Sequence, residues 1–526
     1  MSSKISEEKT IVDLDDVLMK FSTFKKYHIG VLSMIFFGHF FNSFSTLNYI
    51  FAAPDVGYRC KDSSKNACYE FNATGNVCEE WIYDDPNSLV AEFNLACQEW
   101  KRTLIGSVHS FAYMFGLILI GPLSDRIGRK WTTILTGVTC SVIGVLKSFI
   151  TTYWLYLALE FVEAMLGDMF SPIYMLAVEF VATKKRVTFT TLANMGFPVG
   201  GMVMGLIAWL IPYWRTYLRV TYAPALVIIL YQFWMDESPR WLLTKGKKDE
   251  ANAIIQKAAK MNRMKLDKSI MENIVVEESK SVNILVLLKD TFASRILFRR
   301  FLICVVWWIT STFVNYGMTI NSVSLPGNKY ANYAILNLID IPGGVLNFYM
   351  LIYLKRKMTL IASFLFGAVL CLAQPFVPAD MTWLSITMYM AGKTMSTLFF
   401  DTTYLFTSEL FPTYTRNSMH ALCSCLGRIG SILAPQTPLL LVYWSGLPAM
   451  VFGGMALFAG ILTFFVPDTA AVSLPDTVKQ AENIKVKPKS EINVHDASQT
   501  SHRPHSRYSS TETMEIDLAM TENVPL

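Results

Sequence analysis

Charged residues are scarce in this chain of 526 residues. Lys, Arg, Asp and Glu together account for 17% of it, whereas hydrophobic residues account for 52%. A soluble protein of this length would expose much of that apolar surface, so the composition argues against a soluble fold. The apolar residues also occur in runs that are long enough to cross a bilayer. We therefore expect an all-α protein that crosses the lipid bilayer many times.

Motifs of the common enzyme classes are also missing. The sequence has no Walker loop, no H-E-x-x-H pair and no Ser/His/Asp order, so we expect neither an enzyme nor a cofactor. Its nine cysteines include no C-x-x-C pair, which argues against a metal site. The net charge of +5 lies mostly in loops that the positive-inside rule places in the cytoplasm, so no nucleic-acid partner is expected.

The apolar runs form two sets of six. The first set lies near residues 29–51, 103–120, 131–150, 153–177, 188–211 and 217–235, and the second near 301–320, 330–354, 358–377, 383–406, 419–443 and 447–466. Residues 1–26 are polar and lack the pattern of a cleavable signal peptide, so the first span is expected to direct insertion itself.

This pattern divides the chain into five regions. We expect a cytoplasmic N-terminus (1–28), a six-helix bundle (29–236), a basic cytoplasmic linker (237–300), a second six-helix bundle (301–466) and a disordered cytoplasmic tail (467–526). Within the linker, residues 248–261 have the periodicity of a helix.

A loop with several cysteines follows the first span, over residues 52–101. It contains Cys60, Cys68, Cys78 and Cys97, which suggest two disulfides on the extracellular side. Asn72 begins an N-x-T sequon in the same loop and is the expected glycosylation site.

A basic hairpin, residues 121–130 with the sequence G-P-L-S-D-R-I-G-R-K, separates the second and third runs. Its glycines, Gly121 and Gly128, permit a close turn, and its basic residues place it in the cytoplasm. The decapeptide resembles the loop between helices two and three of the major facilitator superfamily. Two further segments resemble the organic cation, anion and carnitine transporter family of that superfamily. Residues 236–243 read D-E-S-P-R-W-L-L, and residues 408–417 read S-E-L-F-P-T-Y-T-R-N.

The resemblance implies the major facilitator fold, with twelve transmembrane helices in two six-helix halves and both termini in the cytoplasm. It also implies a plasma-membrane transporter that moves small organic ions by alternating access. The residues that it assigns to conformational gating are Gly121, Asp125, Arg126, Gly128, Arg129, Glu237, Arg240, Glu409 and Arg416. The chain departs from the superfamily at Glu160 and Glu163, where many members carry Arg and Gln, so the usual contact to Asp125 is in question.

Ionisable residues inside the spans are the best indication of a substrate path, because each is costly in a membrane unless it faces a partner, water or a ligand. They are His39, Glu160, Glu163, Asp168, Asp340, Lys393, Asp401, His420 and Arg428. We expect His39 and His420 to be buried histidines with satisfied hydrogen bonds, the alternative being a role in proton coupling.

Arg428 is the most informative of them. The resemblance implies Asp at this position in cation carriers and Arg in anion and carnitine carriers. Gly344, however, stands where anion carriers often have a second cation. With Asp401 adding negative charge, a zwitterion such as a carnitine-like solute fits the residues at least as well as an anion. The alternative for Arg428 is a fixed structural pair with Asp340 or Asp401.

Aromatic side chains provide cation–π contacts for an ammonium group. The expected substrate-binding residues are therefore Arg428, Asp401, Tyr404, Tyr316, Trp308 and Phe197. A second hypothesis for the whole chain is a sensor that binds a solute on the same fold without transporting it. The sequence assigns no co-transported or exchanged ion.

Overall fold

The computed structural model describes residues 12–21, 25–61, 78, 80–264, 274–275, 292–378, 380–412, 415–469, 475 and 478–483. All of these residues lie within one unit of the chain, residues 1–486. Cys68 and Asn72 lie outside the described residues, so the glycosylation expected at Asn72 stays a prediction.

Six helical segments form the first half. They are α2 (Lys26–Leu47), α5 (Glu99–Ile127), α6 (Arg129–Lys147), α7 with α8 (Tyr153–Leu166 and Phe170–Glu179), α9 with α10 (Arg186–Asn194 and Gly196–Leu210), and α11, η2 and α12 (Trp214–Tyr222, Pro224–Leu230 and Tyr231–Trp234). A short helix, α3 (Tyr49–Ala52), continues α2 after a break at Asn48.

Six segments also form the second half. They are α17 (Arg295–Asn321), α18 with α19 (Lys329–Leu338 and Asp340–Tyr353), α20 (Lys355–Ala373), α21 (Thr382–Leu410), α22 continued by η5 (Arg416–Leu433 and Ala434–Val442), and α23 (Leu447–Thr463). Every segment overlaps an expected run. Among the described residues, eight helical stretches are long and apolar enough to cross a membrane.

The fourth segment is not the single helix that its apolar run predicts. The Asp168 carboxylate accepts hydrogen bonds from the Phe170 amide (2.9 Å) and the Ser171 hydroxyl (2.6 Å). Because this carboxylate satisfies donors that a continuous helix would bond internally, it starts a new helix at α8. An acidic side chain is thereby fixed at mid-span.

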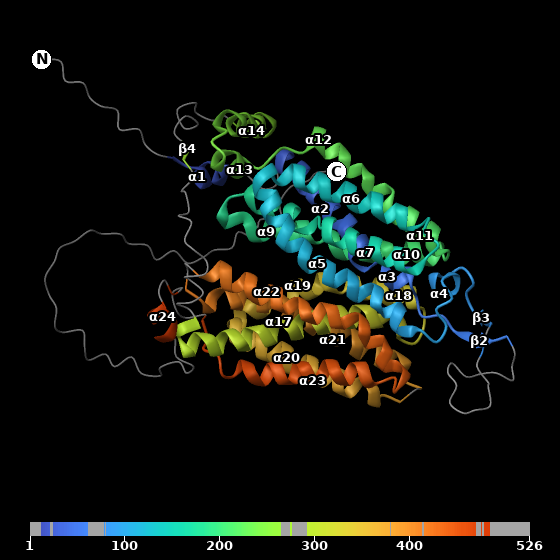
Figure 1. Cartoon of the computed structure of the whole chain (residues 1–526). Helices are drawn as coiled ribbons and strands as arrows, with labels where there is room; N and C mark the ends of the chain where they lie inside the picture. Colours follow the sequence, from blue (N-terminus) through green and yellow to red (C-terminus); the bar gives the residue numbers. More distant parts are fainter. Residues whose placement is uncertain are drawn as a thin grey trace, which may run out of the picture. The chain divides into compact units, whose positions relative to one another are not determined.

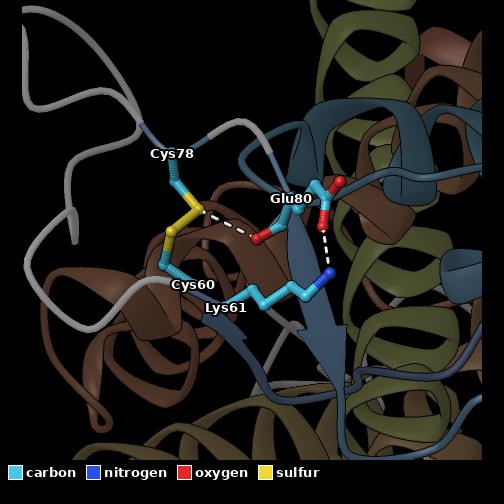
Figure 2. Close-up of a disulfide and its surroundings, with 4 residues drawn as sticks. All are labelled: Cys60, Lys61, Cys78 and Glu80. Atoms are coloured by element: carbon cyan, nitrogen blue, oxygen red, sulfur yellow. Dashed lines mark hydrogen bonds and ion pairs between the residues drawn. A yellow bond between two sulfur atoms is a disulfide. The ribbon is translucent and has the colours of Figure 1, made fainter.

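The cysteine-bearing loop folds on a small antiparallel hairpin. Strands β2 (Tyr58–Cys60) and β3 (Trp81–Tyr83) pair with Tyr58 opposite Tyr83, and a disulfide joins Cys60 to Cys78 (Figure 2). Beside the disulfide, Lys61 forms an ion pair with Glu80 at 2.5 Å (Figure 2). One of the expected disulfides is therefore described. Cys97 is also disulfide-bonded.

A short helix ties this loop to the membrane segments. Glu92, at the end of α4 (Leu89–Glu92), accepts hydrogen bonds from Trp214 Nε1 (2.7 Å) and Arg215 Nε (3.0 Å) on α11. The bond from Arg215 lowers the pKa of Glu92. We call this end of the bundle the cysteine-loop end.

Short helices cover the opposite, hairpin end, where Figure 1 shows α13 (Pro239–Thr244) and α14 (Lys248–Met261). The helix expected over 248–261 is α14. Two short strands, β1 (Val12–Asp13) and β4 (Ile274–Val275), pair in parallel. On α1 (Leu14–Met19), Asp15 accepts a hydrogen bond from the Thr183 amide at 3.2 Å and forms an ion pair with Arg240. The N-terminal segment is therefore docked on the first half.

The tail expected to be disordered from residue 467 contains a docked helix, α24 (Val478–Asn483). Arg300 Nη1, on α17, donates a hydrogen bond to the Ala481 carbonyl at 2.6 Å, and Ser294 bonds Glu482. The prediction of disorder is thus wrong for residues 478–483, because their backbone finds partners on the second half.

The two halves pack together along two pairs of segments. Helix α10 lies between α2 and α18, and α5 packs against α22 and η5. The glycines of α10 make the first contact possible, since a Cβ at Gly200 would meet the Phe40 carbonyl and one at Gly201 would meet Asn337. The recurring glycines of α10, Gly196, Gly200, Gly201 and Gly205, therefore serve close helix packing.

Candidate functional site

Arg428 lies on α22 where that helix faces the first half. Its guanidinium stacks over the ring of Tyr113 on α5, at 4.9 Å from the ring centre. Tyr316, Tyr404 and Asp168 are also within electrostatic reach. The Nε atom of Arg428 is buried and has no hydrogen-bond partner among the described residues.

The acids proposed as fixed partners of Arg428 are arranged differently. Asp340 on α19 faces Lys393 at 3.7 Å and accepts a hydrogen bond from Thr397 at 2.7 Å. Lys393 also donates to Asn315 on α17 at 3.0 Å. Within the described part of the chain, Arg428 has no ion pair, so the alternative of a fixed structural pair is not supported.

Asp401 follows Lys393 by two helical turns on α21, and the two residues share a face of that helix. Lys393 is buried against α17 and α19, whereas Asp401 is exposed. Asp401 and Arg428 are both within electrostatic reach of Tyr404, which follows Asp401 on α21.

An aromatic cluster lies between these charges. The Tyr404 ring is 4.2 Å from that of Trp308 and 5.4 Å from that of His420, measured between ring centres. Trp308 Nε1 donates to the Thr407 hydroxyl at 3.0 Å, which fixes the indole. The structure thus brings together Arg428, Tyr404, Trp308 and Tyr316 from the predicted set.

Phe197 is the predicted residue that the structure does not join to this cluster. It lies on α10 between Gly196 and Gly200, which pack against α2, and no ring contact is found for it among the described residues. Conversely, Tyr113 was not predicted. A tyrosine in an apolar run carries no signal by itself, and only the packing of α5 against α22 places it under Arg428.

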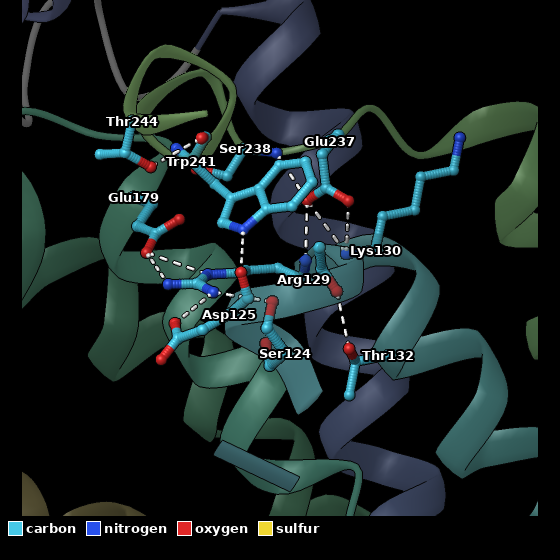
Figure 3. Close-up of polar contacts among 11 residues, drawn as sticks. Ser124, Asp125, Arg129, Lys130, Thr132, Glu179, Glu237, Ser238, Trp241 and Thr244 are labelled. Carbon is cyan, nitrogen blue, oxygen red and sulfur yellow. Dashed lines mark hydrogen bonds and ion pairs between the residues drawn. The ribbon is translucent and has the colours of Figure 1, made fainter. Parts of the chain in front are cut away.

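The basic hairpin contains a network of charges (Figure 3). Arg129 forms an ion pair with Asp125 at 2.6 Å and with Glu179, at the end of α8, at 3.2 Å. Trp241 Nε1 donates to the Asp125 carbonyl at 3.0 Å. The network joins α5, α6, α8 and α13, and it gives Asp125 a partner four residues away.

Glu237 caps the start of α6 (Figure 3). Its carboxylate accepts from the amides of Arg129 (2.9 Å) and Lys130 (3.1 Å), which have no partners within the helix. Burial raises the pKa of Glu237, and the hydrogen bonds from these amides oppose that shift. Gly128 precedes them with φ of 104°, and a Cβ there would meet Glu237. This position therefore requires glycine.

Other residues assigned to gating are distributed more widely. Arg356, at the start of α20, pairs with Glu409 at 3.0 Å, so a second arginine–glutamate pair joins helix ends in the second half. Arg240 binds Asp15. Gly121 and Arg126 are exposed on α5, which continues to Ile127, so the turn is at Gly128 and not at Gly121. Arg416 is the first residue of α22.

Several ionisable residues of the spans are buried away from the hairpin. The sequence put a contact between Glu160 or Glu163 and Asp125 in question, and both glutamates instead contact Lys147 deep in the first half. His39 is buried, but neither of its ring nitrogens has a hydrogen-bond partner among the described residues, so it is not the satisfied histidine that was expected. Nδ1 of His420 likewise has none.

The structure thus has two packed helical halves, with an arginine–glutamate pair at helix ends in each half and Arg428 at the interface between them. Two helical halves that face each other in this way are typical of membrane transporters. Residues 35–435 match the family model described as Major Facilitator Superfamily. The xylose transporter from E. coli in a partially occluded inward-open conformation shares the fold, with a TM-score of 0.59 and 17% identity, over 85% of this chain and 100% of that one.

Relatives with higher sequence identity show which family of this superfamily the chain belongs to. An organic cation transporter protein of Drosophila melanogaster is 33% identical over 78% of both chains. Solute carrier family 22 member 1 of Bos taurus is 32% identical over 78% of this chain and 74% of that one, and member 13 of Homo sapiens is 31% identical over 79% and 75%. The chain belongs to solute carrier family 22, the family of organic cation and anion transporters, and is a transporter and not an enzyme.

Proposed function

We propose that this chain carries small organic ions with a carboxylate group, zwitterions of the carnitine type in particular, across the plasma membrane by alternating access. The observation that supports this most directly is the unpaired Arg428 guanidinium at the interface of the halves. An arginine at mid-span raises the insertion free energy by about 2.5–3.5 kcal/mol unless it meets a partner, water or a ligand. A substrate carboxylate would supply that partner in bidentate geometry.

The surroundings of Arg428 suit the rest of a zwitterion. Asp401 offers a carboxylate to an ammonium group, and the rings of Tyr404 and Trp308 offer cation–π contacts. Lys393 contacts Asp340 and Asn315, and Asp401 has no direct ion pair in the described part of the chain. A simple anion would leave Asp401 without a partner, and a simple cation would leave Arg428 without one.

Alternating access is supported by where the halves touch. Hydrogen bonds between them join Thr103 to Gln436 (2.9 Å), Gln436 to Ser107 (2.7 Å) and Ser107 to the Ile432 carbonyl (2.7 Å). These contacts lie near the start of α5, toward the cysteine-loop end. With that end outside the cell and both termini in the cytoplasm, the path would be closed outward, and the mirrored ion pairs at the hairpin end would govern its reopening.

The test is uptake of three labelled probes, L-carnitine, glutarate and dopamine, into cells that express the chain. We expect saturable uptake of L-carnitine. Arg428→Asp should abolish uptake of L-carnitine and glutarate while surface abundance, measured by biotinylation, stays normal. Arg299→Asp makes the same charge reversal at an exposed position on α17 and should leave uptake unchanged.

Two results would contradict this proposal. Unchanged L-carnitine uptake by Arg428→Asp at normal surface abundance would remove Arg428 from the binding site. Saturable binding of a probe, with no uptake of any of the three, would instead favour the alternative, which is a solute sensor on the transporter fold. The same screen, with sodium and membrane potential varied, identifies the driving ion.

A further inference from the structure

A second group of ionisable side chains lies inside the first half. Lys147 on α6 forms an ion pair with Glu160 at 2.6 Å and also contacts Glu163, both on α7. His109 Nδ1, on α5, is 2.8 Å from the other oxygen of Glu160. The side chains of Lys147, Glu160 and Glu163 are at most 1% exposed.

Both glutamates act as hydrogen-bond acceptors in this group. The Tyr222 hydroxyl accepts from Asn48 Nδ2 (2.6 Å), so it donates its own proton to Glu163 Oε1 (2.6 Å). Lys147 donates a hydrogen bond to Glu160 Oε2 and also contacts Glu163, whose Oε2 is buried without a hydrogen-bond partner among the described residues. If both glutamates were ionised, two negative charges would face the single positive charge of Lys147.

The group is electrically balanced only when it holds one more proton. An uncompensated charge in a low-dielectric interior carries a penalty of several kcal/mol. The remaining titratable neighbours, Tyr49, Tyr156, Tyr222 and Cys140, are neutral hydroxyls and a thiol. His109 and the unpartnered Oε2 of Glu163 can each take up a proton without displacing an existing donor, and His109 as an imidazolium would donate through Nδ1 to Glu160.

Exposure also points to His109 as the point of entry. Its side chain is 7% exposed, whereas that of Glu160 is fully buried. The ring lies 6.1 Å from that of Tyr49 on α3, at the edge of the group. A proton can therefore reach His109 with little movement of the helices.

The same residue is linked to the proposed substrate site. His109 and Tyr113 are four residues apart on α5 and share one face of that helix. The Arg428 guanidinium stacks on the ring of Tyr113. Asp168, just before α8, is within electrostatic reach of both residues. A shift of α5 that accompanies protonation of His109 would therefore move the surface on which Arg428 rests.

We propose that His109, Glu160, Glu163 and Lys147 form a proton-binding site whose occupancy is coupled to transport. One proton enters the site from the solvent through His109 and is held by the His109 imidazole or by Glu163 Oε2, so the site as a whole gains one positive charge. The protonated state is electrically neutral and favours the closed packing of α5, α6 and α7. Release of the proton leaves one net negative charge and favours a rearranged state.

The coupling is tested with purified protein in liposomes, with membrane potential clamped by valinomycin and potassium. An inward proton gradient should raise the initial rate of L-carnitine uptake several-fold over symmetric pH. His109→Gln should lose this acceleration while uptake at symmetric pH persists. His39→Gln removes a buried histidine that has no acidic partner among the described residues, and it should keep the acceleration.

A second measurement needs no substrate and therefore does not depend on the proposed function. The thermal unfolding midpoint of the wild-type chain in detergent should fall as pH rises from neutral to alkaline, because the site then keeps an uncompensated charge. Glu163→Gln balances Lys147 with Glu160 alone, so its midpoint should lose this pH dependence and exceed the wild-type value at alkaline pH.

If His109→Gln fails to fold, the stability of Glu163→Gln as a function of pH still tests the proposal. The proposal is overturned if wild-type uptake is insensitive to the proton gradient, or if both variants retain the wild-type response. It is equally overturned if His39→Gln loses the response to the same extent, or if Glu163→Gln is less stable than wild type at alkaline pH. If neither the wild type nor any variant takes up L-carnitine, but the expected pH dependence of the unfolding midpoint is found, the result contradicts the proposed substrate and not the proton-binding site.

Discussion

Asp125 shows how a single exposed carboxylate can control a network. Its side chain is 69% exposed, yet it holds one side of the Arg129 guanidinium while Glu179 holds another. An exposed ion pair of this kind contributes less than about 1 kcal/mol to stability. We therefore propose that Asp125 acts by setting which helix end Arg129 would follow in a movement of the two halves, and not by stabilising the fold.

We predict that Asp125→Asn lowers the maximum transport rate several-fold and leaves the half-saturation concentration within about twofold, because the change is remote from Arg428. Thermal stability should change little. Kinetics of uptake at matched surface abundance check this, with Asp249→Asn on the exposed face of α14 as the control. A large rise in half-saturation concentration with an unchanged maximum rate would assign Asp125 to substrate binding.

Single residues also show what a sequence can reveal about such a site. Arg428 and Asp401 are identifiable because a charge within an apolar run is unusual. Lys147 is not, since a lysine at the end of a run is expected at the membrane interface, and only the fold turns it toward Glu160. His109 was missed for a related reason, because a histidine in a span has no evident role until Glu160 is placed beside it.

At the level of elements, α10 depends on close approach to both of its neighbours. A Cβ at Gly200 would meet backbone atoms of α2, which cannot move aside as a flexible side chain can. A Cβ at Gly454, in the middle of α23, would meet no described atom within 4 Å.

We predict that Gly200→Ala reduces surface abundance and lowers the thermal unfolding midpoint, because its Cβ would separate α10 from α2 in a tightly packed interior. Gly454→Ala is the matched control. It should be neutral or stabilise the chain by about 0.5–1 kcal/mol, since alanine is the better helix former. Equal behaviour of the two variants would mean that the α2–α10 contact is dispensable.

The sequence predicts where the helical segments lie, but it does not predict where they break. Runs of apolar residues locate the segments, and the basic turns order them, because both follow from the bilayer alone. The breaks at Asn48 and Asp168 are different. They depend on side-chain hydrogen bonds, from Asn48 to Tyr222 and from Ser171 to Asp168, whose partners become visible only after folding.

At the scale of the whole molecule, Gln436 bridges the two halves by bonding both Thr103 and Ser107. A typical hydrogen bond contributes about 0.5–1.5 kcal/mol, so these two bonds are sufficient to shift a balance between conformations.

We predict that Gln436→Ala increases the population open at the cysteine-loop end and lowers the half-saturation concentration for external L-carnitine by up to about tenfold. Gln374→Ala removes a bond to Ser385 that lies within the second half (2.8 Å) and should leave that concentration unchanged. Concentration series of uptake distinguish the two. A rise in half-saturation concentration for Gln436→Ala would indicate that Gln436 binds the substrate.

Each end of the described chain is anchored to a different half. Lys185 binds the Met19 and Phe21 carbonyls at 3.1 and 2.6 Å, which holds α1 on the first half, and Arg300 holds α24 on the second. Fluorophores attached to α1 and α24 would therefore each move with one half as a rigid label. Resonance energy transfer between them would report any movement of one half relative to the other in real time, in full-length protein and with both labels away from Arg428.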